Sequence, residues 1–160
     1  MNEPFKKVYE PNPFAMEMHG RWRATLTDEY GGIKQVVEGD NVVTTAGKQF
    51  LASFLCSAAI AASTFTCKYV AIGSNSTAEA IGDTALGTEL SRHTGTVAWI
   101  SSTIYQVSAT FTAGNGTGTI YEYGLFSSST AGNMLSRDTE ALITKGASDV
   151  LTVVAQITVS

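Results

Sequence analysis

Apolar and polar residues alternate over most of this chain, in runs separated by glycine, serine and threonine. The clearest run begins at Arg21, where Trp22, Ala24 and Leu26 share one side of an extended backbone and polar residues share the other. A period of two predicts a half-buried strand. The turn sequence DEYGG follows at 28–32, and IKQVVEG then returns as a second strand, so we expect a hairpin.

One segment has the spacing of a helix instead. Thr44 and Thr45 offer hydroxyl groups that can cap its first turn. Its apolar positions follow i, i+1, i+4, i+5 spacing and are Phe50, Leu51, Phe54, Leu55, Ala58 and Ala59. We expect this apolar stripe to cover an open face or end of a β core.

The rest of the chain reads as further strands. They are expected at Tyr69 to Ile72, about Thr94 to Ile100, Thr103 to Phe111, Thr119 to Phe126, Met134 to Arg137, and Leu151 to Val159. The last strand should lie in the middle of a sheet. Residues 73–87 form a long loop, which is a candidate contact surface, and AGNGTG at 113–118 is expected to connect a hairpin. Seven to nine strands predict a mainly β fold, an antiparallel β-sandwich or jelly roll with one covering α-helix.

The N-terminus differs from the remaining sequence. All three prolines, Pro4, Pro11 and Pro13, lie in the first thirteen residues, where they disfavour helix and favour an extended chain. Three aromatic residues lie among or beside them: Phe5, Tyr9 and Phe14. An unstructured tail is the alternative, but aromatic residues are unusual in disordered segments. We therefore expect residues 1–20 to form an extended arm that orders against a neighbouring subunit, and residues 21–160 to form a single β domain.

Composition narrows the function classes. The chain has 160 residues, of which 15% are charged, and a formal net charge of −4, which argues against a general binder of nucleic-acid phosphates. Cys56 and Cys67 are the only cysteines; free buried thiols are expected, with a single bridge as the alternative. No secretory signal is visible, and the longest apolar stretch, 50–62, is shorter than the roughly 20 residues that span a bilayer. We expect neither membrane nor nucleic acid as a partner.

Motifs for catalysis or metal binding are sparse. His19 and His93 lie outside any metal or catalytic motif, and the glycines of 113–118 precede a predicted strand rather than the helix that a phosphate cradle needs. The acidic residues Glu79, Asp83 and Glu89 lack the DxDxDG pattern of a calcium loop, so solvated loop charges are expected. We therefore predict no enzyme activity, no cofactor and no metal site. Two ion pairs are expected instead, Glu89 with Arg92 and Arg137 with Asp138, and we place both at subunit contacts.

Four segments carry a family resemblance: NVVTTAGKQFLASFL, YVAIGSNSTAEAIGDTALGTELSR, ATFTAGNGTGTIYEYGLFSSSTAGNMLSRDT and ITKGASDVLTVVAQITVS. Together they resemble a recurring pattern in small virion proteins of tailed bacteriophages, which are described as tail-fibre, collar or head components. The likeness covers about residues 41–160; residues 1–40 fall outside it. It implies a structural protein of the virion and brings no catalytic residues.

The layout of the chain favours one place in the virion. A fibre shaft needs heptads or repeats, and this chain has neither. A compact β domain behind a proline-aromatic arm is similar to a capsid decoration, or cement, protein. We therefore expect a homo-oligomer, a trimer, that binds the phage major capsid protein on the capsid exterior after synthesis in the host bacterial cytoplasm. The predicted interface residues are Pro4, Phe5, Tyr9, Pro11, Pro13, Phe14, Asp83, Glu89 and Arg92.

The alternative is a tail-fibre, collar or tail-tip component that contacts other tail proteins or host glycans. Trp99, Tyr105, Tyr121 and Tyr123 are aromatic residues that can stack on sugars. Because they occupy alternating positions of predicted strands, we expect them in the core instead.

Overall fold

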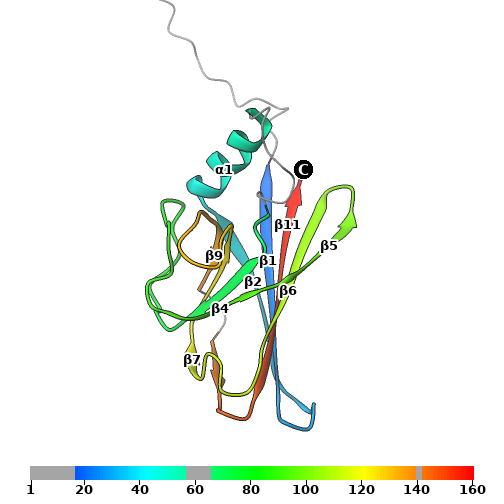
Figure 1. The fold of residues 1–160 in the computed structure, drawn as a ribbon, viewed down its shortest axis with the longest axis vertical. Coiled ribbons are helices and arrows are strands. Elements are labelled where there is room, and N and C mark those ends of the chain that lie inside the picture. The colour runs from blue at the N-terminus through cyan, green and yellow to red at the C-terminus, as the bar shows by residue number, and fades with distance from the viewer. Residues whose placement is uncertain (1–16, 57–65, 140–141) are drawn as a thin grey trace, which may run out of the picture.

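The computed structural model describes residues 17–56, 66–139 and 142–160, and these form a mainly β structure with one helix (Figure 1). The strands are antiparallel, as predicted. In chain order the elements are β1 (Met18–Thr27), β2 (Ile33–Val43), α1 (Thr45–Cys56), β3 (Tyr69–Gly73), β4 (Glu89–Thr94), β5 (Thr96–Ser101), β6 (Ile104–Phe111), β7 (Gly118–Ile120), β8 (Glu122–Phe126), β9 (Met134–Asp138), β10 (Ile143–Lys145) and β11 (Val150–Val159).

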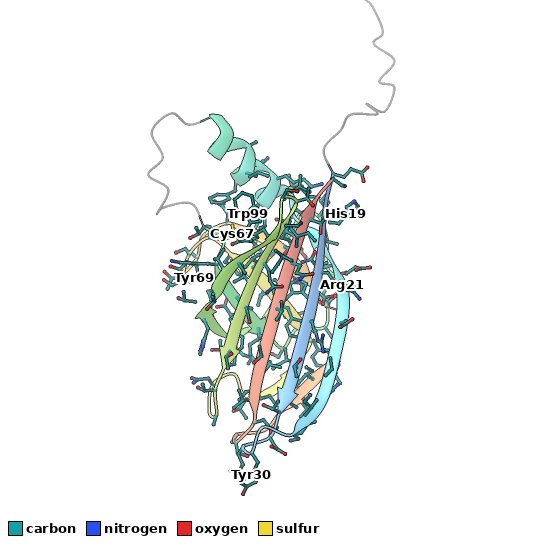
Figure 2. The ribbon with its side chains drawn as sticks, turned by 90° about the vertical axis from the view of Figure 1, so that its right-hand side faces the viewer. His19, Arg21, Tyr30, Cys67, Tyr69 and Trp99 are labelled. Atoms are coloured by element: carbon teal, nitrogen blue, oxygen red, sulfur yellow. The ribbon has the colours of Figure 1, made fainter. Side chains whose placement is uncertain are left out.

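Nine strands form one curled sheet in the order β4-β3-β8-β9-β2-β1-β11-β6-β5, and β10 pairs separately with β7. The longer strands β2, β1, β11 and β6 lie side by side in Figure 2. Strand β2 belongs to both halves of the sheet, because it pairs with β1 along most of its length and with β9 through Val42 and Val43. This shared strand lets the sheet curl around a single core.

The two edges of the sheet are consecutive in the chain. β4 and β5 are the edge strands, and Gly95 alone separates them. The N–H of Gly95 donates to the carbonyl of Lys68 at 2.7 Å, and a Cβ at this position would lie 2.4 Å from a methyl group of Val107. The close approach of the two halves therefore requires glycine at this bend.

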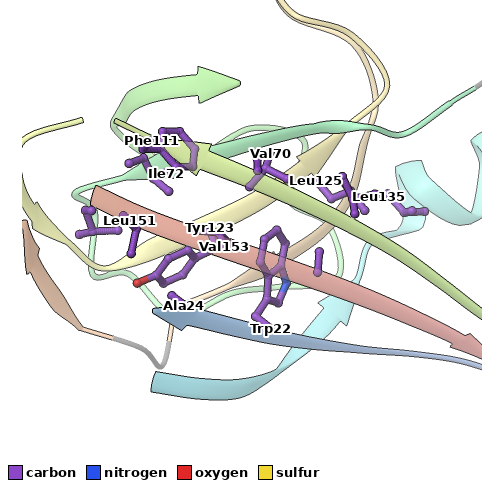
Figure 3. Close-up of a cluster of buried hydrophobic side chains, with 14 of the residues drawn as sticks. Trp22, Ala24, Val70, Ile72, Phe111, Tyr123, Leu125, Leu135, Leu151 and Val153 are labelled. Atoms are coloured by element: carbon purple, nitrogen blue, oxygen red, sulfur yellow. The ribbon is translucent and has the colours of Figure 1, made fainter. Parts of the chain in front are cut away.

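The core lies inside the curl and draws on both halves of the sheet (Figure 3). Trp22 from β1 and Tyr123 from β8 approach each other with ring centroids 6.0 Å apart. Alternate residues of β11 complete the inner surface, namely Leu151, Val153, Ala155 and Ile157. The predicted β1–β2 hairpin is confirmed, and so is the central position of β11, which lies between β1 and β6.

The predicted helix and its cap are also confirmed. The hydroxyl of Thr44 accepts the N–H of Gly47 at 3.0 Å and donates to the carbonyl of Met134 at 2.5 Å. α1 lies at one end of the β structure (Figure 1), and Phe50 packs against the core. The apolar positions that we predicted beyond Cys56 fall outside the described residues.

Three local predictions need correction. Residues 113–118 do not connect a hairpin, because β6 pairs with β5 and β11 whereas β7 pairs with β10. The segment expected as one strand at 94–100 is split by Gly95, and β4 begins at Glu89, between the predicted loop at 73–87 and the predicted strand start at Thr94. The described residues contain eleven strands rather than seven to nine, since β4, β7 and β10 are short elements that alternation does not separate from loops.

Candidate interaction surface

The arm residues of the predicted interface, Pro4, Phe5, Tyr9, Pro11, Pro13 and Phe14, lie outside the described residues. Within the described part, β1 begins at Met18, so the last residues of the predicted arm already belong to the sheet. The backbone groups of Glu17 and Ser160 bond to each other in both directions, at 2.8 and 3.0 Å. The arm therefore departs next to the carboxyl end of the chain.

Glu89 and Arg92 form the predicted ion pair within one chain. The guanidinium meets the carboxylate at 2.9 Å from Nε and 2.6 Å from Nη2. Arg92 also lies 3.6 Å above the ring centre of Phe126 and donates to the carbonyls of Ser128 and Ala131. These bonds fix β4 to the turn after β8. A role for this pair at a subunit contact stays a prediction.

Asp83 forms its ion pair with Arg137 and not with Arg92. Nη1 of Arg137 donates to Asp83 at 2.7 Å, and Nη2 donates to Glu122 at 2.9 Å. Burial lowers the pKa of Arg137, but the hydrogen bonds and charges of both carboxylates outweigh that effect and raise it above its usual value. The expectation of a freely solvated Asp83 is therefore wrong, and Arg137, which we predicted to pair with Asp138, forms its ion pairs with Asp83 and Glu122.

Glu122 is the centre of this cluster and has no exposed surface. Besides Arg137, its carboxylate accepts the backbone N–H groups of Asn75, Gly87 and Thr88 at 3.2, 2.9 and 2.8 Å. Both ends of the loop between β3 and β4 are thereby bonded to one side chain. We call this group the loop clasp, and it makes residues 74–88 part of a rigid scaffold.

An apolar groove opens at the end of the molecule that carries α1. We call it the end groove; it has a volume of about 220 Å³ and its main lining residues are Met18, Phe50, Leu51, Tyr105, Ile157 and Val159. Cys67 also lines it, and burial raises the pKa of this free thiol to about 12. Tyr105 holds the adjoining segment by donating its hydroxyl to the carbonyl of Cys67. The groove wall is thus apolar and locally fixed.

A second hollow, of about 610 Å³, continues the groove along the β5–β6 hairpin. We call it the β5 shelf and define it by Val97, Ala98, Trp99 and Ile104. The two hollows share Leu51, Tyr105 and Val159, so they form one apolar surface. Figure 2 shows Trp99 and Cys67 at the α1 end and Tyr30 at the opposite end.

We predicted that Trp99 lies in the core, and this is wrong, because 82% of its surface is exposed. Val97 and Ile100 on the same strand are exposed as well. β5 is also an edge strand, so one row of its backbone N–H and C=O groups faces away from the sheet. The sequence signal was present in the run TVAWIS, where apolar residues occur on both faces just before a serine turn.

The other aromatic residues considered for sugar stacking differ in how deeply they are buried. Tyr123 is buried, as expected, whereas Tyr105 and Tyr121 are half-buried. Among the described residues, no group of three or more His, Cys, Asp or Glu side chains is arranged to hold a metal ion. No helix in the described ranges has the length and apolar character needed to cross a membrane.

Comparisons of the chain with protein-family models, curated proteins and solved structures gave no match.

Proposed function

We propose that this protein is a structural component of a bacteriophage virion, a capsid decoration protein that binds the outer shell as a homotrimer. The continuous apolar surface of the end groove and the β5 shelf supports the proposal, since soluble proteins rarely leave such a surface without a partner. The family resemblance of residues 41–160 points to the same class of protein. In this proposal the curled sheet is the counterpart of the jelly-roll β-sandwich of a cement protein.

The structure is suited to binding a partner through a preformed surface. The hydroxyl of Tyr105 holds the groove wall by its bond to the carbonyl of Cys67, so less conformational entropy is lost when this surface binds. Tryptophan is among the residue types that contribute most binding free energy to protein interfaces. Trp99 is such a residue, exposed next to an apolar groove. Three linked copies would add avidity to each weak contact with the capsid.

The same tryptophan favours the second candidate, a tail-fibre, collar or tail-tip component. Exposed Trp99 can stack on a sugar ring of a host glycan. The two functions differ in where the protein lies on the particle and in whether a free glycan competes for the surface.

The test uses particles of the bacteriophage whose genome carries this sequence. We expect mass spectrometry to detect the protein in purified particles and immunoelectron microscopy to place the label over heads. Label at the tail would support the alternative, and absence from particles would overturn both candidates.

A pair of variants then tests the surface. Trp99→Ser should lower binding of the added protein to undecorated heads at least about tenfold, as expected for an interface hot spot. Tyr30→Ser is the matched control, because Tyr30 is 89% exposed at the opposite end of the molecule. Equal binding by both variants would remove the surface from the proposal.

A further inference from the structure

We infer that the end groove and the β5 shelf bind the proline-aromatic segment, residues 4–14, of a second copy of this chain. The inference rests on the proposed function, because it supplies the contact through which a homo-oligomer would form. It gives this apolar surface a second copy as its partner, so Trp99→Ser would weaken binding to heads by removing the avidity of the linked copies and not a direct capsid contact.

The first support is where the chain leaves the sheet. Met18 is both the first residue of β1 and a lining residue of the end groove. The paired backbone bonds between Glu17 and Ser160 fix the chain at that rim. Sixteen residues precede Glu17, and a chain of that length can extend about 50 Å. This reach covers the distance to an adjacent molecule of similar size.

The second support is chemical complementarity. The segment carries Phe5, Tyr9 and Phe14 among its three prolines, and proline-rich chains bind in grooves that aromatic side chains line. Aromatic residues line both parts of this surface: Phe50 and Tyr105 in the groove and Trp99 on the shelf. The unpaired edge of β5 adds backbone donors and acceptors for an extended partner.

The direction of β1 favours a second copy over the same chain. Glu17 continues the β1–β11 ladder outward, since it bonds with the last residue of the chain. A return into the groove of the same copy requires a reversal over Ala15 and Met16, and neither is a residue type that turns favour. A neighbouring groove is accessible without that reversal.

The experiment uses the full chain in solution, with mass from light scattering. We expect wild-type protein to form an oligomer, and two kinds of variant to remain near the monomer mass of 16.9 kDa. The arm variant carries Phe5→Ser, Tyr9→Ser and Phe14→Ser. The groove variant carries Leu51→Asp, with Val97→Asp as a second version in case Leu51→Asp does not fold. Val36→Asp is the control, because Val36 is 41% exposed and lies outside both hollows.

Mixing the variants tests exchange between copies. The arm variant keeps an intact groove and the groove variant keeps an intact arm, so the mixture should form pairs of about twice the monomer mass. Trp99 reports on the same event: its emission should shift to the blue when the pair forms, while Trp22, which is 1% exposed, should stay constant.

Two results would overturn the inference. One is a wild-type monomer, including a monomer whose Trp99 emission changes in the arm variant, since that pattern means the segment binds its own groove. The other is a mixture that stays monomeric. A wild-type monomer would also remove the homotrimer from the proposed function, but either result leaves a capsid decoration protein standing if the protein is still found on heads, so the two failures can be told apart.

Discussion

At the scale of single residues, the buried Tyr123 and the half-buried Tyr105 contrast in their bonding. The hydroxyl of Tyr123 is buried without a hydrogen-bond partner among the described residues, and burial followed by the charge of Asp138 raises its pKa. The hydroxyl of Tyr105 donates to the carbonyl of Cys67. An unpaired buried hydroxyl destabilises the fold, whereas a paired one contributes about 1 kcal/mol.

We therefore expect opposite effects from the same substitution. Tyr123→Phe should raise the free energy of unfolding by about 1 kcal/mol, because it removes an unsatisfied polar group and keeps the ring against Trp22. Tyr105→Phe should lower it by about 1 kcal/mol, because the carbonyl of Cys67 loses its donor. Urea denaturation of both variants measures the difference. A loss of stability in Tyr123→Phe equal to that in Tyr105→Phe would contradict this account.

The alternation of apolar and polar residues predicted which way a side chain points better than it predicted which residues that side chain contacts. Trp22, Leu26 and Val153 were placed inward correctly, since a half-buried strand must alternate between core and solvent. The exposure of Trp99 was missed because alternation shows which face a residue occupies and not how far the core extends along the strand. β5 extends past the end of the buried core, so the side chains on its inward face line the β5 shelf instead.

At the scale of elements, the loop between β3 and β4 depends on one buried carboxylate. The sequence shows Glu122 only as a polar residue in an apolar strand. Its burial arises from non-local bonds, to Arg137 on β9 and to three backbone N–H groups at the two ends of the loop. No local pattern encodes such contacts, and the loop clasp was accordingly absent from the predicted site.

Glu122→Gln should lower the free energy of unfolding by about 3 kcal/mol, because it leaves the buried guanidinium of Arg137 with one carboxylate and weakens the loop bonds. Limited proteolysis should then cut within residues 74–88 at an increased rate. The matched control is Glu38→Gln, which breaks an exposed pair with Arg21 and should cost at most about 1 kcal/mol. Similar losses in the two variants would show that the clasp adds no more than a surface pair.

At the scale of the whole molecule, curling of the sheet was the least predictable property. Strand identity follows from alternation, but the order β4-β3-β8-β9-β2-β1-β11-β6-β5 depends on which strands pair. The curl depends on Gly95, where the chain passes from one edge strand to the other. A glycine between two strands reads equally well as a simple turn, so the sequence does not distinguish a flat sheet from a curled one.

The molecule also has an acid-sensitive ion pair that links the two strands on either side of β1. Asp149, directly before β11, accepts both bonds of Lys34 from β2, at 2.9 and 2.8 Å, and the N–H of Gly146 at 2.8 Å. The bonds from Lys34 and then from Gly146 lower the pKa of Asp149 below its ordinary value of 3.8. The folded state therefore releases a proton that the unfolded chain still holds near that pH.

Stability from this ion pair is complete at neutral pH and is lost as the pH falls from about 5 through 3.8 toward the lowered pKa. We expect Asp149→Asn to lower the thermal midpoint at pH 7 and to make it less dependent on pH in that acid range. Lys34→Gln should flatten the same range, and the double variant should lose little more than either single one, because both remove one interaction. Thermal unfolding followed by circular dichroism over the pH series measures all three. Additive losses, or an acid range as steep in Asp149→Asn as in the wild type, would assign the acid sensitivity to other carboxylates.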